Sequence, residues 1–266
     1  MAQGLEKIIV EKYYISDDLD QLKSNGSLVS GSITYRIFVD MKAGYRFQAA
    51  YGIPGHPLSI STSTYFFNDN NYGSSVADNV LPGYLKKGVV MLDSWLSVGA
   101  GAENMFAILK SSDTTSAIVS SDSSLQNSNP LAGDPLRVHD GLLYASPLPK
   151  VLIYGIDAAM LKLFDKGIGQ KNGEKFYTEN GSWACLNGAI GFDSTNTVLI
   201  AQITTNGQLT FSLNLQIGSP AGGVENYVSS NPMSSDKYLS ELNYPLVAEK
   251  IKSGKKIMKV GSEDKN

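Results

Sequence analysis

Alternating apolar and polar residues predict short β-strands in the first part of the chain. The alternation is clearest from Ile33 to Asp40, with Ile33, Tyr35, Ile37 and Val39 on one face and Thr34, Arg36 and Asp40 on the other. Phe38 interrupts the polar face, so this strand should be covered on both sides. Further strands are expected at 8–15, 45–51, 58–67, 89–96, 105–109 and 151–156, with a hairpin connection at 41–44, a rigid turn at 53–57 and a loop at 68–73.

The segment from Val198 to Ile217 predicts a β-hairpin centred on Asn206-Gly207. This dipeptide suits a type I′ turn, in which both central residues need positive φ. The turn would pair Thr205 with Gln208 and place Leu213 opposite Ile200 and Leu215 opposite Val198. The second strand then points Leu209, Phe211, Leu213, Leu215 and Ile217 inward and Thr210, Ser212, Asn214 and Gln216 outward. The first strand is apolar on both faces from Val198 to Ala201 and should lie centrally in its sheet.

These strands indicate an all-β fold, an antiparallel β-sandwich or a jelly-roll-like arrangement. The Ser/Asn/Asp/Thr-rich stretch 111–135 is a long loop or a boundary, dividing an N-terminal β region (1–125) from a C-terminal β region (126–245). The two regions form either one continuous domain or two related halves. The second alternative rests on Ser94-Trp95 and Ser182-Trp183, each of which precedes glycines and an apolar run. One or two helical turns are expected at 157–164, with Asp157 as the N-cap.

Composition narrows the class of protein. The 266 residues carry a net charge of −3, and only 18% of them are charged. The overall electrostatic potential of the protein therefore favours binding neither to nucleic acid nor to an anionic membrane. Cys185 is the single cysteine, which excludes an internal disulfide and a cysteine metal cluster. The N-terminus lacks the pattern of a signal peptide, and no apolar run approaches the roughly 20 residues of a membrane helix.

Candidate chemistry is sparse. His56 and His139 are interpreted as surface or turn histidines because neither accompanies a nucleophile motif. Gly167-Ile168-Gly169 lacks dinucleotide-loop spacing and is read as a turn. Asp17, Asp18 and Asp20 could hold Ca²⁺, but exposed turn acids are the favoured interpretation. The sequons Asn25-Gly26-Ser27 and Asn180-Gly181-Ser182 are better read as turns. No catalytic residue, metal site or cofactor is predicted.

Two further sets of residues are candidates for contact with partners. Tyr65, Phe66, Phe67 and Tyr72 would stack on sugars if exposed, although core and loop packing is the favoured interpretation. The tail 246–266 carries Lys250, Lys252, Lys255, Lys256 and Lys259 among apolar residues. It is either a solvated extension or an arm that docks on an acidic neighbouring subunit.

Several segments resemble β-rich proteins of Bacteroidota and of the crAss-like tailed phages that infect them. The segments are 9–17, 32–40, 90–99, 180–184 and 198–207, and the likeness spans about nine-tenths of the chain. In the phage setting, the resemblance implies a virion component such as an auxiliary capsid protein or head fibre. The bacterial relatives look like secreted surface proteins, and no functional residue is carried over.

The expected function is therefore a non-enzymatic structural component of a tailed-phage virion, decorating the capsid or forming a head fibre. Its partners would be major capsid or fibre proteins and further copies of itself, with a host-surface glycan as an additional ligand and without nucleic acid or membrane contact. The alternative is a carbohydrate-binding or adhesive β-sandwich, and a glycan-degrading enzyme ranks last for want of a candidate base.

Overall fold

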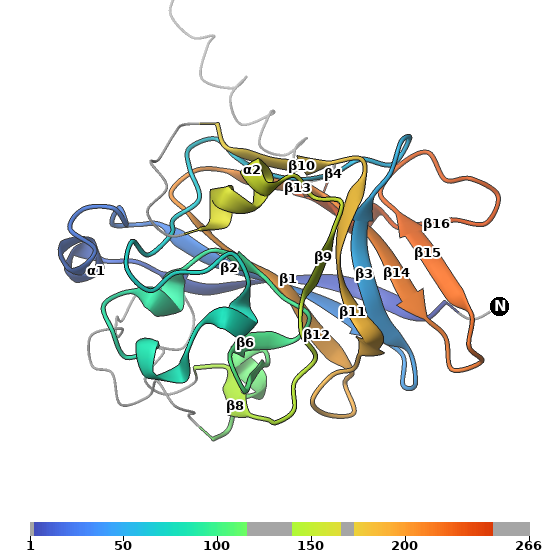
Figure 1. The fold of residues 1–266 in the computed structure, drawn as a ribbon, viewed down its shortest axis with the longest axis horizontal. Helices are drawn as coiled ribbons and strands as arrows, with labels where there is room; N and C mark the ends of the chain where they lie inside the picture. Colours follow the sequence, from blue (N-terminus) through green and yellow to red (C-terminus); the bar gives the residue numbers. More distant parts are fainter. Residues whose placement is uncertain (1–2, 116–139, 166–172, 247–266) are drawn as a thin grey trace, which may run out of the picture.

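The chain folds into β-sheets joined by short helices and loops (Figure 1). The computed structural model describes residues 3–115, 140–165 and 173–246. Strands make up 42% of the structure and helical residues 13%, which confirms the predicted all-β class and is consistent with a sandwich. All strand pairs are antiparallel apart from one short parallel pair between β15 and β16.

Four sheets are named here after one of their strands. The β1 sheet has the order β1 (Leu5–Ile15), β2 (Ile33–Met41), β12 (Thr197–Thr205), β5 (Trp95–Leu96). The six-stranded β3 sheet has the order β16 (Lys237–Tyr238), β15 (Val224–Val228), β14 (Asn214–Gly218), β3 (Arg46–Gly52), β11 (Gly181–Ala189), β9 (Leu152–Tyr154). The β4 sheet has the order β10 (Lys175–Thr178), β4 (Leu58–Thr62), β13 (Leu209–Ser212), β17 (Asn243–Tyr244). The β6 sheet comprises β6 (Ala100–Ala102), β7 (Met105–Ala107) and β8 (Leu142–Tyr144).

The helical elements are short. The α-helices are α1 (Asp18–Lys23) and α2 (Ala158–Leu161), and the latter is capped by Asp157 as predicted, because its side chain accepts from the Ala159 N–H at 2.7 Å. The 3₁₀ turns are η1 (Ala77–Asn79), η2 (Pro82–Tyr84), η3 (Val90–Leu92), η4 (Lys110–Ser112), η7 (Lys162–Phe164) and η8 (Ser240–Leu242).

Two apolar cores lie on opposite faces of the β1 sheet. The first core joins Ile37 and Val39 of β2 to side chains of the β3 and β4 sheets, including Trp183 and Phe176. The second core joins Phe38 of β2 to the helical turns η1 and η3 and to the β6 sheet. The prediction that the strand around Phe38 is covered on both sides is therefore confirmed.

The predicted Asn206-Gly207 hairpin is wrong. β12 pairs with β2 and β5, whereas β13 pairs with β4 and β17, so the two strands belong to different sheets. Neither Asn206 nor Gly207 adopts the positive φ of a type I′ turn. Instead the connection crosses between sheets and packs on the end of β4, where the Gln208 N–H donates to Ser63 Oγ at 2.9 Å. A Cβ at position 207 would lie 2.5 Å from Thr64 Oγ1, so the glycine is needed for close approach and not for a turn type.

The burial pattern around this crossing was predicted more accurately than its pairing. Val198 to Ala201 are at most 1% exposed and β12 lies inside its sheet, as predicted. Leu209, Phe211, Leu213, Leu215 and Ile217 are all buried, as predicted. Asn214 is a correction: it is fully buried instead of facing outward, because its amide donates to three backbone carbonyls, of Tyr51, His56 and Pro57.

Other expectations need smaller corrections. The connection at 41–44 turns, with the Tyr45 N–H donating to Lys42 O at 3.1 Å, but it joins strands of different sheets instead of a hairpin. The predicted strand 89–96 is the 3₁₀ turn η3 followed by the two residues of β5. The strand predicted at 58–67 ends at Thr62. Those predicted at 105–109 and 151–156 are present in shorter form as β7 and β9.

The loop predicted at 111–135 lies mostly outside the described residues. Strands from either side of it share sheets, since β12 pairs with β2 and β11 and β14 both pair with β3. Both tryptophans of the proposed repeat are buried, Trp95 in the second core and Trp183 in the first.

Candidate functional site

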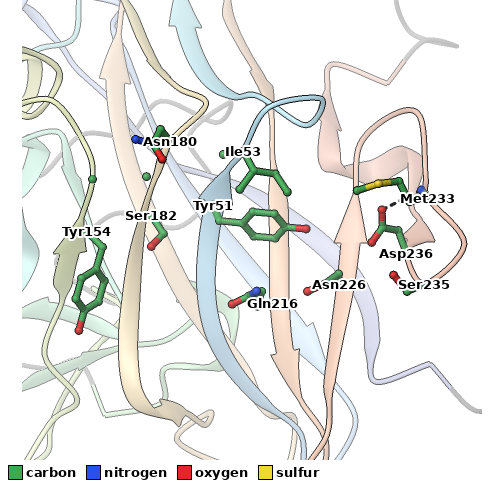
Figure 2. Close-up of a pocket in the computed structure, with 13 residues that line it drawn as sticks. Tyr51, Ile53, Tyr154, Asn180, Ser182, Gln216, Asn226, Met233, Ser235 and Asp236 are labelled. Carbon is green, nitrogen blue, oxygen red and sulfur yellow. Dashed lines mark hydrogen bonds between the residues drawn. The ribbon is translucent and has the colours of Figure 1, made fainter.

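An open groove of about 530 Å³ lies on the face of the β3 sheet that points away from the first core (Figure 2). Strand pairing explains how residues distant in sequence meet there. Ser182 of β11 is paired with Tyr51 of β3 on one side and with Tyr154 of β9 on the other. Directly paired residues point to the same face, so these three side chains form one row across the sheet. The neighbouring residue, Trp183, points into the core and is fully buried.

A second row lies beside the first. Gln216 of β14 is paired with Asn226 of β15, and both side chains face the groove (Figure 2). The far wall is the segment between β15 and β16, which supplies Met233, Ser235 and Asp236. The remaining lining residues are Gly52, Ile53, Gly155, Asn180 and Gly181.

Glycine shapes one end of the groove. Gly155 follows β9 with φ of +64°, and a Cβ there would lie 2.2 Å from Asn180 O. A side chain at this position would therefore push apart the end of β9 and the beginning of β11. Glycine at position 155 therefore allows β9 and β11 to lie close together at this end of the groove.

The lining is polar but nearly uncharged. Amide and hydroxyl groups come from Asn180, Ser182, Gln216, Asn226 and Ser235, and Asp236 is the carboxylate among the described lining residues. Tyr154 is 56% exposed and presents its ring at the edge of the groove. These groups can donate and accept hydrogen bonds to hydroxyls, with one aromatic surface beside them.

Tyr51 offers its hydroxyl as a hydrogen-bond donor, whereas its buried ring is no stacking surface. Its side chain is only 8% exposed. Burial, with the negative charge of Asp236 nearby, raises the pKa of Tyr51 to about 12. Its hydroxyl therefore stays protonated at neutral pH.

The side chain of Asp236 holds the far wall in place. Its Oδ2 accepts from the Met233 N–H at 2.9 Å and lies 3.4 Å from Nε2 of His56, and both side chains are at most 4% exposed. His56 stands in the predicted turn, but it is buried, which corrects the expectation of a surface position. His56 is part of the described chain and makes no hydrogen bond to a serine, threonine or cysteine, so it forms no nucleophile–base pair.

Asn226 has unused hydrogen-bonding capacity. Its Oδ1 is buried and accepts no hydrogen bond from the described residues. A buried acceptor without a donor costs about 1–3 kcal/mol. A donor supplied to this amide after a small rotation of its side chain would recover part of that free energy.

The aromatic residues singled out in the sequence lie elsewhere. Phe66 and Phe67 are 1% exposed and belong to the first and second core, so they cannot stack on a ligand. Tyr65 is partly buried, and its hydroxyl donates to Ser27 O at 3.3 Å. Tyr72 packs against the ring of Tyr84, with the two ring centres 4.6 Å apart.

The acidic cluster is structural. Asp17 caps α1, and Asp20 is fully buried with its carboxylate accepting from the Tyr14 hydroxyl at 3.0 Å. The exposed-acid interpretation is therefore wrong for Asp20. Throughout the described residues, no group of three His, Cys, Asp or Glu side chains is arranged to hold a metal ion.

Several candidates lie outside the described residues. They are His139, Gly167-Ile168-Gly169 and the lysines Lys250, Lys252, Lys255, Lys256 and Lys259. Within the described chain, no helix has the length and apolar character needed to span a bilayer.

Sequence reasoning missed the groove because its signal is spread over five strands. The outward residue of each strand is unremarkable by itself, and only the pairing of β9, β11, β3, β14 and β15 brings these residues together. No protein-family model, no curated protein and no solved structure matches the chain. The geometry of the groove and the surface around it therefore carry the functional argument.

Proposed function

We propose that this chain is a non-enzymatic binding protein whose groove on the β3 sheet holds a neutral carbohydrate. The observation that carries the proposal is the lining itself, in which neutral amides and hydroxyls converge beside the exposed ring of Tyr154. Sugars present hydroxyls around an apolar ring face, which matches a lining of this kind. The volume of about 530 Å³ falls within the range of about 300–1,000 Å³ of small-molecule sites.

Charge narrows the class of sugar. The described lining includes the carboxylate of Asp236 and no lysine, arginine or histidine. An acidic sugar would be repelled by Asp236 and would find no cation to pair with. Neutral hexoses and N-acetylhexosamines are therefore favoured over uronic and sialic acids.

The same lining supports binding without hydrolysis. Glycoside hydrolysis generally uses two carboxyl groups on either side of the scissile bond. Asp236 is engaged with the Met233 N–H and His56, and no second carboxylate joins it among the described residues of the groove.

A glycan array followed by calorimetry tests this proposal. We expect neutral oligosaccharides to bind and Tyr154→Ala or Gln216→Ala to weaken binding about tenfold, which corresponds to about 1.4 kcal/mol. Tyr144→Ala is the matched control, because Tyr144 is 68% exposed on β8 and lies outside the groove. Absence of binding to every neutral glycan would refute the proposal.

We also propose that the chain is displayed on a tailed-phage virion, as decoration or head fibre. The resemblance to proteins of crAss-like phages supports this placement. A structural observation favours protein–protein contact: Leu186, Ile190 and Phe192 are 73%, 50% and 50% exposed within seven residues at the end of β11. Clustered exposed apolar side chains are typical of contact surfaces.

Mass spectrometry of purified particles tests the virion proposal. The chain should be present in many copies per particle. Leu186→Asp should reduce its incorporation, whereas Leu22→Asp on α1 should not, although Leu22 is equally exposed at 73%. Particles that lack the chain would overturn this placement without affecting the glycan proposal.

A further inference from the structure

The groove on the β3 sheet is long in the direction that crosses the strands. Its lining runs from β9 at one end to β15 and the far wall at the other, and β9 and β15 are four strand spacings apart in the sheet (Figure 2). Neighbouring strands lie about 4.7–4.9 Å apart, so the groove is about 19 Å long. A pyranose unit in an extended glycan occupies about one such spacing. A single sugar unit would therefore leave most of the groove empty.

The end of the groove beyond β15 is closed by the far wall, which is the segment 229–236. Both ends of this segment are held in place. At its start the Ser229 N–H donates to Oδ1 of the buried Asn214 at 3.3 Å. At its end the Asp236 N–H donates to Met233 O at 3.0 Å, and Asp236 Oδ2 accepts from the Met233 N–H at 2.9 Å. The far wall is therefore a fixed stop at which a bound chain has to end.

The opposite end of the groove is open. β9 is the last strand of the β3 sheet, and no further strand of the described chain pairs with its outer side. Tyr154 is 56% exposed at this edge. Gly155 and Gly181, which also line this end, have no side chains that could obstruct a ligand. A bound chain can consequently leave the groove over β9.

We infer, resting on the proposed function, that the groove binds the end of a neutral glycan chain. The terminal sugar unit lies against the far wall, and the rest of the chain leaves past Tyr154 over β9. The length of the groove corresponds to about four sugar units. The site therefore recognises the end of a glycan and not its interior.

The side chains of the far wall suit a terminal unit. Ser235 is exposed, and its hydroxyl can both donate to and accept from a sugar hydroxyl. A terminal unit carries a free hydroxyl where an interior unit carries a glycosidic oxygen, which cannot donate. Met233 is 56% exposed and offers an adaptable apolar surface to the face of the sugar ring.

Calorimetric titration with oligosaccharides of increasing length tests the extent of the site. The probes are glucose to cellohexaose, glucose to maltohexaose and N-acetylglucosamine to chitohexaose. In the series that binds, affinity should rise about tenfold or more from the disaccharide to the tetrasaccharide and then stay constant. A monosaccharide that binds as tightly as the tetrasaccharide would overturn this inference and leave the proposed function standing. Absence of binding by every probe would also overturn it, whereas the proposed function falls only with a negative glycan array.

Two matched variants test which end of the groove holds the terminal unit. Met233 and Tyr154 are both 56% exposed, so neither substitution should disturb folding. Met233→Ala should weaken binding of the disaccharide and the tetrasaccharide by the same factor, because both reach the far wall. Tyr154→Ala should weaken binding of the tetrasaccharide about tenfold and leave the disaccharide unchanged. Equal losses for both ligands in Tyr154→Ala would contradict the placement of the chain end.

Blocking the ends of the ligand tests whether one end is enclosed. The tetrasaccharide is labelled with a bulky fluorophore at its reducing end or, separately, at its non-reducing end. One label should abolish binding, because that end has to reach the far wall. The other should change the Kd by less than about threefold, because its end projects past Tyr154. Binding that tolerates both labels, or neither, would overturn the inference.

Discussion

The two cores on either side of the β1 sheet are stabilised in different ways. The first core is almost entirely apolar, with Trp183 among its aromatic side chains. The second core adjoins a chain of buried polar groups. Arg36 is 1% exposed, with its guanidinium carbon 3.5 Å from the centre of the Tyr13 ring and its Nε–H donating to Gln202 Oε1 at 2.9 Å.

The polar groups of the second region connect loops to the sheet. The Gln202 amide donates to Met91 O at 2.9 Å and to Asp93 O at 2.7 Å. Lys110 Nζ donates to Tyr13 O at 2.9 Å, and burial raises the pKa of Glu11. The first core needs only well-packed apolar side chains. The polar network beside the second core depends instead on individual hydrogen-bond and charge partners. The two regions should therefore respond differently to substitutions of similar size.

The largest effect is expected from Arg36→Met. This change keeps most of the side-chain volume but leaves Gln202 Oε1 without its donor and the buried Glu11 with only Lys110 of its two neighbouring positive charges. Breaking one partner of a buried charged network costs about 3–5 kcal/mol. Urea denaturation measures this loss. The exposed Arg46→Met should change stability by less than about 0.5 kcal/mol, and equal costs at the two positions would contradict the comparison.

A smaller, pH-dependent effect is expected at Asp20, whose carboxylate bonds Tyr14 of the second core. Burial raises the pKa of Asp20 from 3.8 to about 6. Between these values the folded state holds the proton and the unfolded state does not, so stability falls as pH rises from about 4 to 6. In Asp20→Asn this loss of folding stability should be about 1–2 kcal/mol smaller. Urea midpoints measured across that pH range test the expectation. An unchanged slope in the variant would refute the assignment.

The apolar side should tolerate a small deletion. Ile200→Val removes one methylene from the first core and should cost about 1 kcal/mol. Thermal unfolding followed by circular dichroism is a sufficient measurement. A loss as large as that of Arg36→Met would mean that the first core is no more tolerant than the polar network.

The smallest effect on stability is expected at the groove. Tyr154→Ala should change the free energy of unfolding by less than about 0.5 kcal/mol, because this side chain is 56% exposed. The same variant is expected to weaken glycan binding. A large loss of stability would show that Tyr154 has a structural role instead.

The sequence predicted the apolar side better than the polar side, and the physical reason is periodicity. Ile37, Val39, Leu213 and Leu215 repeat at the interval of a strand, so their burial follows from local pattern alone. The Arg36–Gln202 bond joins residues 166 positions apart, and a polar residue on a strand does not reveal whether it meets solvent or a partner. Arg36 was accordingly predicted only to lie opposite the apolar face.

The same limit explains the errors around Asn206-Gly207 and at the groove. The dipeptide is a local signal for a hairpin. Tertiary contacts with Ser63 and Thr64 instead direct the chain from the β1 sheet into the β4 sheet. Tyr51, Ser182 and Tyr154 form a row only because β3, β11 and β9 are neighbours. Nothing in their own segments encodes that neighbourhood.

The position of β12 between β2 and β5 has a consequence for biosynthesis. With 166 residues between Arg36 and Gln202, a ribosome adding about 5–20 residues per second needs roughly 8–30 seconds to deliver the partner strand. During that interval β1 and β2 expose an unpaired edge with apolar side chains on both faces. Nascent chains should consequently recruit chaperones, and slower translation after residue 41 should increase aggregation instead of relieving it.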